Sequence, residues 1–538
     1  MADPREDPPR RPPNETWKTR YEAGRPLGVG LDPAVEPEPG VPAYPTDYAP
    51  SHLLVSASER LRPIERELNV AARAFGWTVR MRSLRGETVD IESAQRSAEV
   101  DRAAGRTPQL YRADILQDPK ADVDDQPVPP VDAWRLLKVA RPRLPRGVGL
   151  DHVLSLGPFG RTNPFGRTNP FGRTNPFGRT NPFGRTNAPG AEGYAEPGGG
   201  GREVVTYVGP RPARSGDTGV KGRRPVVVVL DTGCGDHDWL KAPVVDRAPA
   251  SSAGPIGLTD PNTDPEVYPD QSGPLDGFLD EAAGHGTFVA GVVHQLCPDA
   301  RIIAVRVANS QGTVLEGDFI EAIRMLVEWM KEPDAQPIDV MNISLGYYHE
   351  TPDDEHYDAT LGALLREARD LGCAIVCSAG NDSTERPAFP AALWLYPGAP
   401  ADAVESKDAA PHLSVGALNP NDRSVALFSN VGDWVRTYAP GVSVFSTSPG
   451  FVGGVQAGTR DDLHHTPDDT MLPRQSLDPD DWRCGFAIWS GTSFAAPYIA
   501  GRLAQAIAAD LMHGSLKTPA SRKEALRSAA KKLEFTPR

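Results

Sequence analysis

The sequence has little of what marks secreted or membrane-bound proteins. Its 538 residues include five cysteines, an odd number and too few for a disulfide framework in a chain of this length. No segment approaches the run of about 18 apolar residues that a membrane span requires. The amino terminus, MADPREDPPRRPPNETW, also lacks the apolar core of a secretory signal. We therefore expect a reducing, cytoplasmic location and no membrane partner.

Positive charge is scarce as well. Lys and Arg number 57 against 71 Asp and Glu, which gives a formal net charge of −14. Nucleic acids and anionic lipids bind proteins with an excess of basic residues, so we expect no nucleic-acid partner. In contrast, 55 prolines and 52 glycines make up about a fifth of the chain. This composition predicts substantial stretches without regular structure.

The amino-terminal third divides into a tail and a small domain. Residues 1–50 are rich in proline and show no sustained periodicity, which predicts a disordered tail. Residues 51–156 predict a small α+β domain. Apolar residues at three- and four-residue spacing over 61–75 indicate a helix. Strand-like runs lie at 52–57, 77–81, 110–116, 133–140 and 148–156.

A repeat follows within residues 157–201. The unit PFGRTN occurs five times from Pro158 to Asn187, and a glycine-rich stretch comes next. A six-residue unit rich in Pro, Gly and Asn cannot bury a core, so the segment is interpreted as a spacer. The alternative is weak multivalent contact with partners or RNA through the repeated Phe, Gly and Arg. Nothing else in this acidic chain supports that alternative.

Residues 202–515 have the pattern of a large α/β domain. The run PVVVVL at 225–230 predicts a strand buried on both faces, and helical patterns alternate with apolar runs after it. This alternation predicts a three-layer fold with a mostly parallel, doubly wound sheet. Cys373 and Cys377 lie in one such run, CAIVC, and are interpreted as small core residues rather than metal or redox ligands. Residues 516–538 predict a charged tail or a helix.

Four segments of this domain place reactive side chains where strands end or helices begin. Asp231 follows PVVVVL, His285 opens a helix between two glycines, Asn381 follows a strand in CSAGND, and Ser493 begins a long helix. Each alone has an ordinary explanation as a cap or turn residue. Together they supply an acid, a base, an oxyanion donor and a nucleophile. A serine hydroxyl needs an imidazole to take its proton, and the imidazole needs a carboxylate to orient it.

The segments DTG, GHGTFVAG, SAGN and GTSFAAP, in this order, resemble the subtilase family of subtilisin-like serine peptidases. The resemblance covers roughly residues 202–512. It implies a serine endopeptidase that cleaves polypeptides through an acyl-enzyme. Asp231 would be the triad acid, His285 the general base and Ser493 the nucleophile. Asn381 and the backbone N–H of Ser493 would stabilise the oxyanion.

The resemblance also implies a substrate-binding strand. Ser344, Leu345 and Gly346 of NISLG match the family's strand that pairs with an extended substrate backbone, and NSQGT at 309–313 is a weaker match to the opposing strand. No cofactor is implied as required. Many members bind calcium, but no ligand pattern here assigns a calcium site or any other metal site.

The chain departs from the family in two respects. Typical members are secreted, whereas no signal is visible here. In addition, a Gly- and Asp-rich excursion over about residues 448–485 contains DDLHHTPDD. Clustered Asp and His can bind a metal, but in a loop they are more often a solvated surface. The alternative is that the excursion covers the cleft or contacts a partner.

The role of residues 51–156 is left open between two interpretations. Family members often carry a small α+β pro-domain that inhibits the site until it is cleaved off. A long spacer and the lack of a clear pro-domain motif favour an independent recognition module instead, which would bind a regulatory partner and gate the peptidase. A further rival is a silent peptide-binding domain without turnover, although all four catalytic positions are filled.

Overall fold

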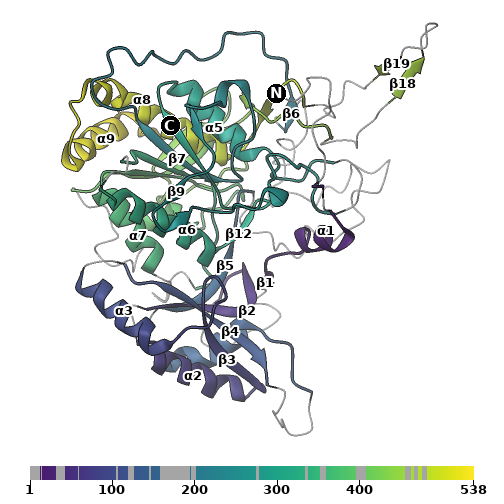
Figure 1. Ribbon diagram of the computed structural model, residues 1–538, viewed down its shortest axis with the longest axis vertical. Helices are drawn as coiled ribbons and strands as arrows, with labels where there is room; N and C mark the ends of the chain where they lie inside the picture. The colour runs from purple at the N-terminus through teal and green to yellow at the C-terminus, as the bar shows by residue number, and fades with distance from the viewer. Residues whose placement is uncertain are drawn as a thin grey trace.

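The computed structural model describes a large α/β unit and a smaller α+β unit that packs against it (Figure 1). No helix in the described part of the chain has the length and apolar character needed to cross a bilayer. The described residues are 12–13, 15–31, 43–57, 60–104, 107–118, 127–144, 147–157, 194, 201–273, 278–333, 337–351, 359–395, 408–454, 462–465, 471–474 and 482–537.

A parallel sheet forms the centre of the large unit. Its first strand along the chain is β7 (Val226–Asp231), in which all six residues are buried. The strand order is β16-β15-β14-β13-β7-β11-β8, and each neighbouring pair runs parallel. The remaining strands are β8 (Val245–Asp246), β11 (Arg301–Arg306), β13 (Val340–Ile343), β14 (Ala374–Ser378), β15 (His412–Leu418) and β16 (Thr437–Pro440). The predicted fold class is therefore confirmed.

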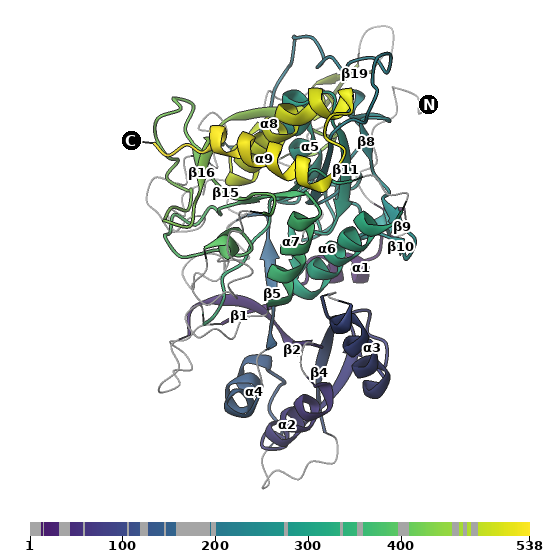
Figure 2. The ribbon, with the colours of Figure 1, turned by 90° about the vertical axis from the view of Figure 1, so that its left-hand side faces the viewer.

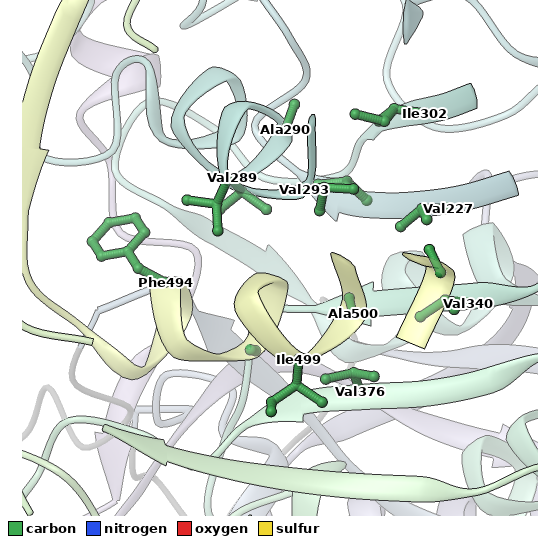
Figure 3. Packing of buried hydrophobic residues seen from close by; sticks show 14 of the residues in the cluster. Val227, Val289, Ala290, Val293, Ile302, Val340, Val376, Phe494, Ile499 and Ala500 are labelled. Atoms are coloured by element: carbon green, nitrogen blue, oxygen red, sulfur yellow. The ribbon is translucent and has the colours of Figure 1, made fainter. Parts of the chain in front are cut away.

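Helices cover both faces of this sheet because successive β7 side chains point to opposite faces. Val227 and Val229 pack with α5 (His285–Leu296), α8 (Thr492–His513) and α9 (Pro519–Leu533). Figure 3 shows Val289 of α5 and Ile499 of α8 in this layer. The alternate β7 residues pack with α6 (Glu316–Lys331) and α7 (Ala359–Asp370).

The carboxyl terminus belongs to this unit. Helix α9 buries Leu526 and Ala530 in the same core as α8, and its Arg522 donates a hydrogen bond to the carbonyl of Leu371. Residues 516–538 therefore contain a packed helix, and the domain extends to Leu533, beyond the predicted limit at residue 515.

The smaller unit is an antiparallel sheet with helices packed against it (Figure 2). Its strand order is β5-β2-β4-β3. The strands are β2 (Thr46–Ser56), β3 (Trp77–Ser83), β4 (Leu110–Gln117) and β5 (Val148–Ser155), and the helices are α2 (Leu61–Arg73), α3 (Ile91–Ala103) and α4 (Ala133–Ala140).

The prediction of a strand over 133–140 was wrong, because this segment is helix α4. Its buried residues include Ala133, Trp134, Leu137 and Ala140, which recur at the three- and four-residue spacing of one helical face. The Asp132 side chain caps the helix by accepting a hydrogen bond from the N–H of Arg135 at 2.8 Å. A run of eight apolar-rich residues is too short for periodicity alone to separate helix from strand.

The prediction that residues 1–50 form a disordered tail was wrong for part of that segment. It contains α1 (Trp17–Ala23), β1 (Val29–Leu31), which pairs with β2, and the start of β2 itself. Arg20 anchors α1 to the large unit by donating to the carbonyl oxygens of Asp270 and Gly273, and it pairs with the Asp270 carboxylate. These polar contacts join residues about 250 positions apart, so they produce no periodic apolar pattern in the sequence around α1.

The short elements complete the fold. The PFGRTN repeat lies outside the described residues, and of the stretch that follows it up to residue 200 only Tyr194 is described. The remaining strands are β6 (Glu203–Val204), β9 (Ala250–Ser251), β10 (Gly254–Pro255), β12 (Thr313–Leu315), β17 (Val444–Thr447), β18 (Asp462–His465), β19 (Met471–Arg474) and β20 (Phe486–Trp489). The short 3-10 helices are Arg141–Arg143, Asp238–Leu240, Pro261–Thr263 and Ala391–Trp394.

One strand joins the two units. Strand β12 of the large unit pairs antiparallel with β5 of the small one, so the small sheet continues into the large unit. Beside it, the Asp151 carboxylate accepts a hydrogen bond from the N–H of Gly317 in the first turn of α6, at 2.9 Å. Arg324 of α6 donates to the carbonyl oxygens of Thr107 and Pro108. These contacts place the end of β5 at the carboxyl edge of the parallel sheet.

Candidate active site

Asp231 and His285 meet at the carboxyl edge of the parallel sheet. Asp231 is the last residue of β7, and His285 is the first residue of α5. The His285 Nδ1 lies 2.8 Å from Oδ1 and 3.0 Å from Oδ2 of Asp231. Both side chains are buried. The carboxylate therefore fixes the ring and directs Nε2 away from itself.

A glycine makes this approach of helix and strand possible. A Cβ atom on Gly286 would lie 2.1 Å from the carbonyl oxygen of Gly233, in the turn after Asp231. Only a residue without a side chain fits there. The GHG and DTG segments therefore pack backbone against backbone.

Ser493 lies in the first turn of α8, where unpaired N–H groups and the helix dipole favour negative charge. Its Oγ is 3.1 Å from the carbonyl oxygen of Leu156 and 3.4 Å from that of Ser344. Among the described residues, no hydrogen bond joins this hydroxyl to His285. The two residues are nevertheless neighbours, since the His285 ring packs on Phe494, with centroids 5.1 Å apart.

Asn381 lies beside the same helix start. Its Oδ1 accepts hydrogen bonds from the backbone N–H and the hydroxyl of Thr492, at 2.9 and 2.8 Å. These bonds fix the amide so that Nδ2 is its donor, and Nδ2 lies 3.6 Å from where a Gly491 Cβ would be. The four predicted residues are thus brought to one edge of the sheet.

The two predicted substrate-binding segments both pair with a strand of this same chain, the end of β5. Ser155 and Gly346 exchange both backbone hydrogen bonds, at 3.0 and 3.1 Å, and the N–H of Leu156 donates to the carbonyl of Gly312 at 2.9 Å. The end of β5 thus lies between the 309–313 segment and the Gly346 segment. Ser344 lies beneath the site, where its Oγ donates to the Ser493 carbonyl, and Leu345 is buried in the core.

A buried carboxylate that the sequence analysis missed joins the two sides of the acid–base pair. Glu266 accepts hydrogen bonds from the hydroxyls of Thr232 and Thr287 and from the N–H of Gly286. Burial raises the pKa of Glu266 to about 7, although the two hydroxyls oppose this. It lies 19 residues before His285 in a loop rich in Pro and Asp, and no motif in the sequence marks it.

Arg202 was also missed as a site residue. Its guanidinium lies between the rings of Trp482 and Trp489, 4.8 and 4.5 Å from their centroids. It donates to the carbonyl of Ala283, and the Trp489 ring packs edge-on against His285 at 5.4 Å. Burial lowers the pKa of Arg202 to about 9. This cluster forms one wall beside the imidazole.

A second buried charge cluster lies where the two units meet. His152 of β5 lies between two carboxylates, with Nδ1 2.6 Å from Glu316 and Nε2 2.8 Å from Glu350. Burial alone would lower the pKa of His152, but the two carboxylates raise it to about 10. His152, His349 and Glu350 offer ligand atoms within 4.8 Å of one another. Because both nitrogens of His152 are already bonded to carboxylates, an ion pair accounts for this cluster without a metal.

The interpretation of the 448–485 excursion as a solvated surface rather than a metal site stays a prediction, because most of its Asp- and His-rich part lies outside the described residues. Of that part, β18 and β19 are described, and they pair as an antiparallel hairpin.

The family model of the subtilase family matches residues 222–537, more than half of the chain. The chain belongs to the subtilase family. The matched range contains all four predicted site residues, Glu266 and both segments predicted to bind substrate. Arg202 and the smaller unit lie outside it.

Curated subtilases with sequence similarity include bacterial enzymes named as intracellular. An "Intracellular serine protease" of Paenibacillus polymyxa is 28% identical over 299 residues, which are 53% of this chain and 67% of that protein. The "Major intracellular serine protease" of Bacillus subtilis is 28% identical over 257 residues, 45% of this chain and 65% of that protein. "Serine protease AprX" of the same organism is 29% identical over 246 residues, 43% of this chain and 49% of that protein.

The matches thus span about half to two thirds of these relatives. A solved structure of a cold adapted subtilisin-like serine proteinase aligns with 61% of this chain and 87% of that one, at 20% identity and a TM-score of 0.36.

Proposed function

We propose that this subtilase is a serine endopeptidase whose smaller amino-terminal unit is an intramolecular inhibitor and its first substrate. The observation that carries the proposal is the hydrogen bond from Ser493 Oγ to the carbonyl oxygen of Leu156. This carbonyl belongs to a strand held on both sides by backbone hydrogen bonds. Strand addition is how an extended peptide binds a sheet edge. The segment therefore occupies the cleft in the manner of a substrate.

The reaction would proceed at the bond between Leu156 and Gly157. The Ser493 hydroxyl turns from the carbonyl oxygen to His285, which takes its proton, and Oγ attacks the Leu156 carbonyl carbon. His285 then protonates the departing amine of Gly157, which leaves Leu156 as an acyl ester on Ser493. Water, deprotonated by the same imidazole, releases the acyl group. Asp231 stays ionised and stabilises the imidazolium at each step.

The oxyanion of each tetrahedral intermediate would be stabilised by Asn381 Nδ2 and the N–H of Ser493. Support comes from the fixed Asn381 amide and from the helix start at Ser493. Every group in this scheme is a side chain or a backbone N–H, so we propose that the chemistry requires no cofactor. Polypeptides are then the substrates in trans once the inhibitor leaves. Two relatives named as intracellular support a cytoplasmic site of action.

Covalent labelling tests the proposed chemistry. A fluorophosphonate should label Ser493 slowly while β5 fills the cleft and rapidly after the amino-terminal unit is released. Ser493→Ala should remove both the labelling and the hydrolysis of peptides while the chain stays folded. A folded chain that is never labelled, even after that unit is released, would favour the rival function of a silent peptide-binding domain.

A gating role for a regulatory partner makes a different prediction. If a partner of the smaller unit controls the enzyme, activity in trans should appear on binding of that partner to the uncleaved chain. If the unit is only a cleavable inhibitor, activity should appear only with cleavage and release. Time courses of cleavage and of peptide hydrolysis on the same sample separate the two cases.

A further inference from the structure

We propose that Glu266 is a positioning residue for the peptidase reaction, a buried carboxylate that fixes the strand-end acid against the helix that carries the general base. This inference rests on the proposed function, since it concerns the same reaction. Glu266 is 2% exposed. Within the described part of the chain, its side chain forms hydrogen bonds to Thr232, Gly286 and Thr287 and none to the imidazole or to β5. Its effect must therefore pass through the residues it binds.

The hydrogen bonds of Glu266 join the two catalytic segments directly. Oε1 accepts from the Thr232 hydroxyl at 2.5 Å and from the Gly286 N–H at 3.0 Å, and Oε2 accepts from the Thr287 hydroxyl at 2.5 Å. Thr232 follows the triad acid, and Gly286 and Thr287 follow the base. One carboxylate thus ties the turn after Asp231 to the first turn of α5.

The threonines extend this link in both directions. The Thr232 hydroxyl also accepts from the Gly286 N–H at 2.8 Å, and the Thr232 N–H donates to Asp231 Oδ1 at 2.8 Å. The Thr287 hydroxyl accepts from the N–H of Gly235 at 2.7 Å. The Thr232 hydroxyl is also 3.2 Å from Asp231 Oδ1. The two hydroxyls and the Gly286 N–H can all donate to an ionised Glu266, which favours its charged form.

Charge makes a second contribution. A negative charge next to the acid–base pair favours the imidazolium that forms during the reaction. The ionised form of Glu266 is costly because it is buried, which raises its pKa to about 7. Below that pH, Glu266 gains a proton, one of its acceptor sites becomes a donor, and the added negative charge is lost. The charged or titratable groups that interact with it are Asp231, Asp264, Arg202, Arg306 and Cys234.

Glu266→Gln tests the inference while preserving shape. The glutamine oxygen can keep the bonds to Thr232 and Gly286, but its NH₂ must face the Thr287 hydroxyl, which then loses its acceptor. Because Leu156 already lies in the cleft of the full chain, the first-order rate of cleavage at Leu156–Gly157 reports chemistry without a binding step. We expect E266Q to slow this cleavage by about 10–100-fold, with KM for an added peptide unchanged and kcat reduced.

The pH profile separates positioning from simple destabilisation. In the wild-type chain, protonation of Glu266 lowers the rate in addition to the loss of the free general base. The logarithm of the cleavage rate should therefore fall on the acid side with a slope steeper than one until the contribution of Glu266, about 10–100-fold, is lost. In E266Q one of these ionisations is gone, and the slope should be one. Ile323→Val is the control, since it removes one methyl group from the core on the opposite face of the sheet. It should cost about 1 kcal/mol of stability and leave rate and slope unchanged.

Slower cleavage in E266Q with the changed slope supports the inference. A wild-type rate and slope in folded E266Q overturn it, as does a slower rate that keeps the wild-type slope. A wild-type chain that neither cleaves itself nor is labelled by a fluorophosphonate overturns the proposed function instead. Should E266Q fail to fold, Thr287→Val removes the hydroxyl that donates to Oε2 and favours the ionised carboxylate. It should slow cleavage and move the acid side of the pH profile to higher pH, and an unchanged rate and profile in folded T287V overturn the inference.

Discussion

Docking of the amino-terminal unit should depend on pH through one histidine. His152 lies at the junction of the two units, buried between Glu316 and Glu350 and stacked on the Tyr347 ring at 4.6 Å between centroids. Tyr347 donates to the other oxygen of Glu316, and Arg141 donates to the other oxygen of Glu350. Each carboxylate thus needs a cation or donor on both oxygens, and His152 supplies this only when it is protonated.

The sign of the effect follows from the pKa of His152 in the two states. In the docked state, the two carboxylates raise the pKa of His152 from 6.5 to about 10 despite its burial. In the released state, this pKa returns to its ordinary value. A raised pKa in the docked state means that docking is strongest below pH 6.5 and is lost as the pH rises toward 10. Each pH unit within this window should weaken docking by up to about tenfold. Glu350 has a pKa held well below its usual range, so it stays ionised throughout.

The assay follows the lag before peptide hydrolysis after cleavage at Leu156–Gly157, because the lag reports release of the cleaved unit. It should shorten steeply between pH 6.5 and 8.5 in the wild-type chain, after correction for the pH dependence of the fully released enzyme. His152→Gln keeps a hydrogen-bonding side chain but no titrating proton, so its lag should be short and nearly independent of pH. An equal pH dependence in both proteins would refute the role of His152.

Two further substitutions test separate contacts. Arg20→Ala removes the buried ion pair with Asp270 that anchors α1. Hydrogen exchange over 17–23 should then approach that of an unprotected peptide, while exchange in β7 stays unchanged. Wild-type protection over 17–23 would contradict this anchoring. Gly286→Ala places a Cβ 2.1 Å from the Gly233 carbonyl oxygen, so it should lower the free energy of unfolding by about 1–3 kcal/mol and abolish self-cleavage. Its control is Gly149→Ala in β5, where no atom lies within 4 Å of the added Cβ; similar losses in both would show that crowding is not the cause.

The central sheet could be predicted because its signal is local. The valine run of β7 and the alternation of strands and helices indicate a strand buried on both faces, whatever lies around it. The positions of Asp231, His285 and Ser493 follow from the same rule, since the carboxyl ends of parallel strands share one edge. Helix α4 was mistaken for a strand because eight residues carry too little periodicity to decide.

The contacts that regulate and support the site could not be predicted in this way. The pairing of β5 with β12 joins residues about 160 apart in sequence, and nothing local to VGLDHVLSL indicates a partner in another unit. Glu266 lies in an irregular loop, and only the folded chain brings it against Thr232 and Gly286. Long-range polar contacts of this kind depend on the complete fold rather than on composition or period.

The most direct test of the account is the mass of the full chain after it folds in solution, measured beside its Ser493→Ala variant. The wild-type chain should yield two fragments separated at Leu156–Gly157, and the variant should keep the mass of the intact chain. An intact wild-type chain under conditions in which it is folded, or the same break in both proteins, would contradict an enzyme whose own strand occupies its active site as a substrate.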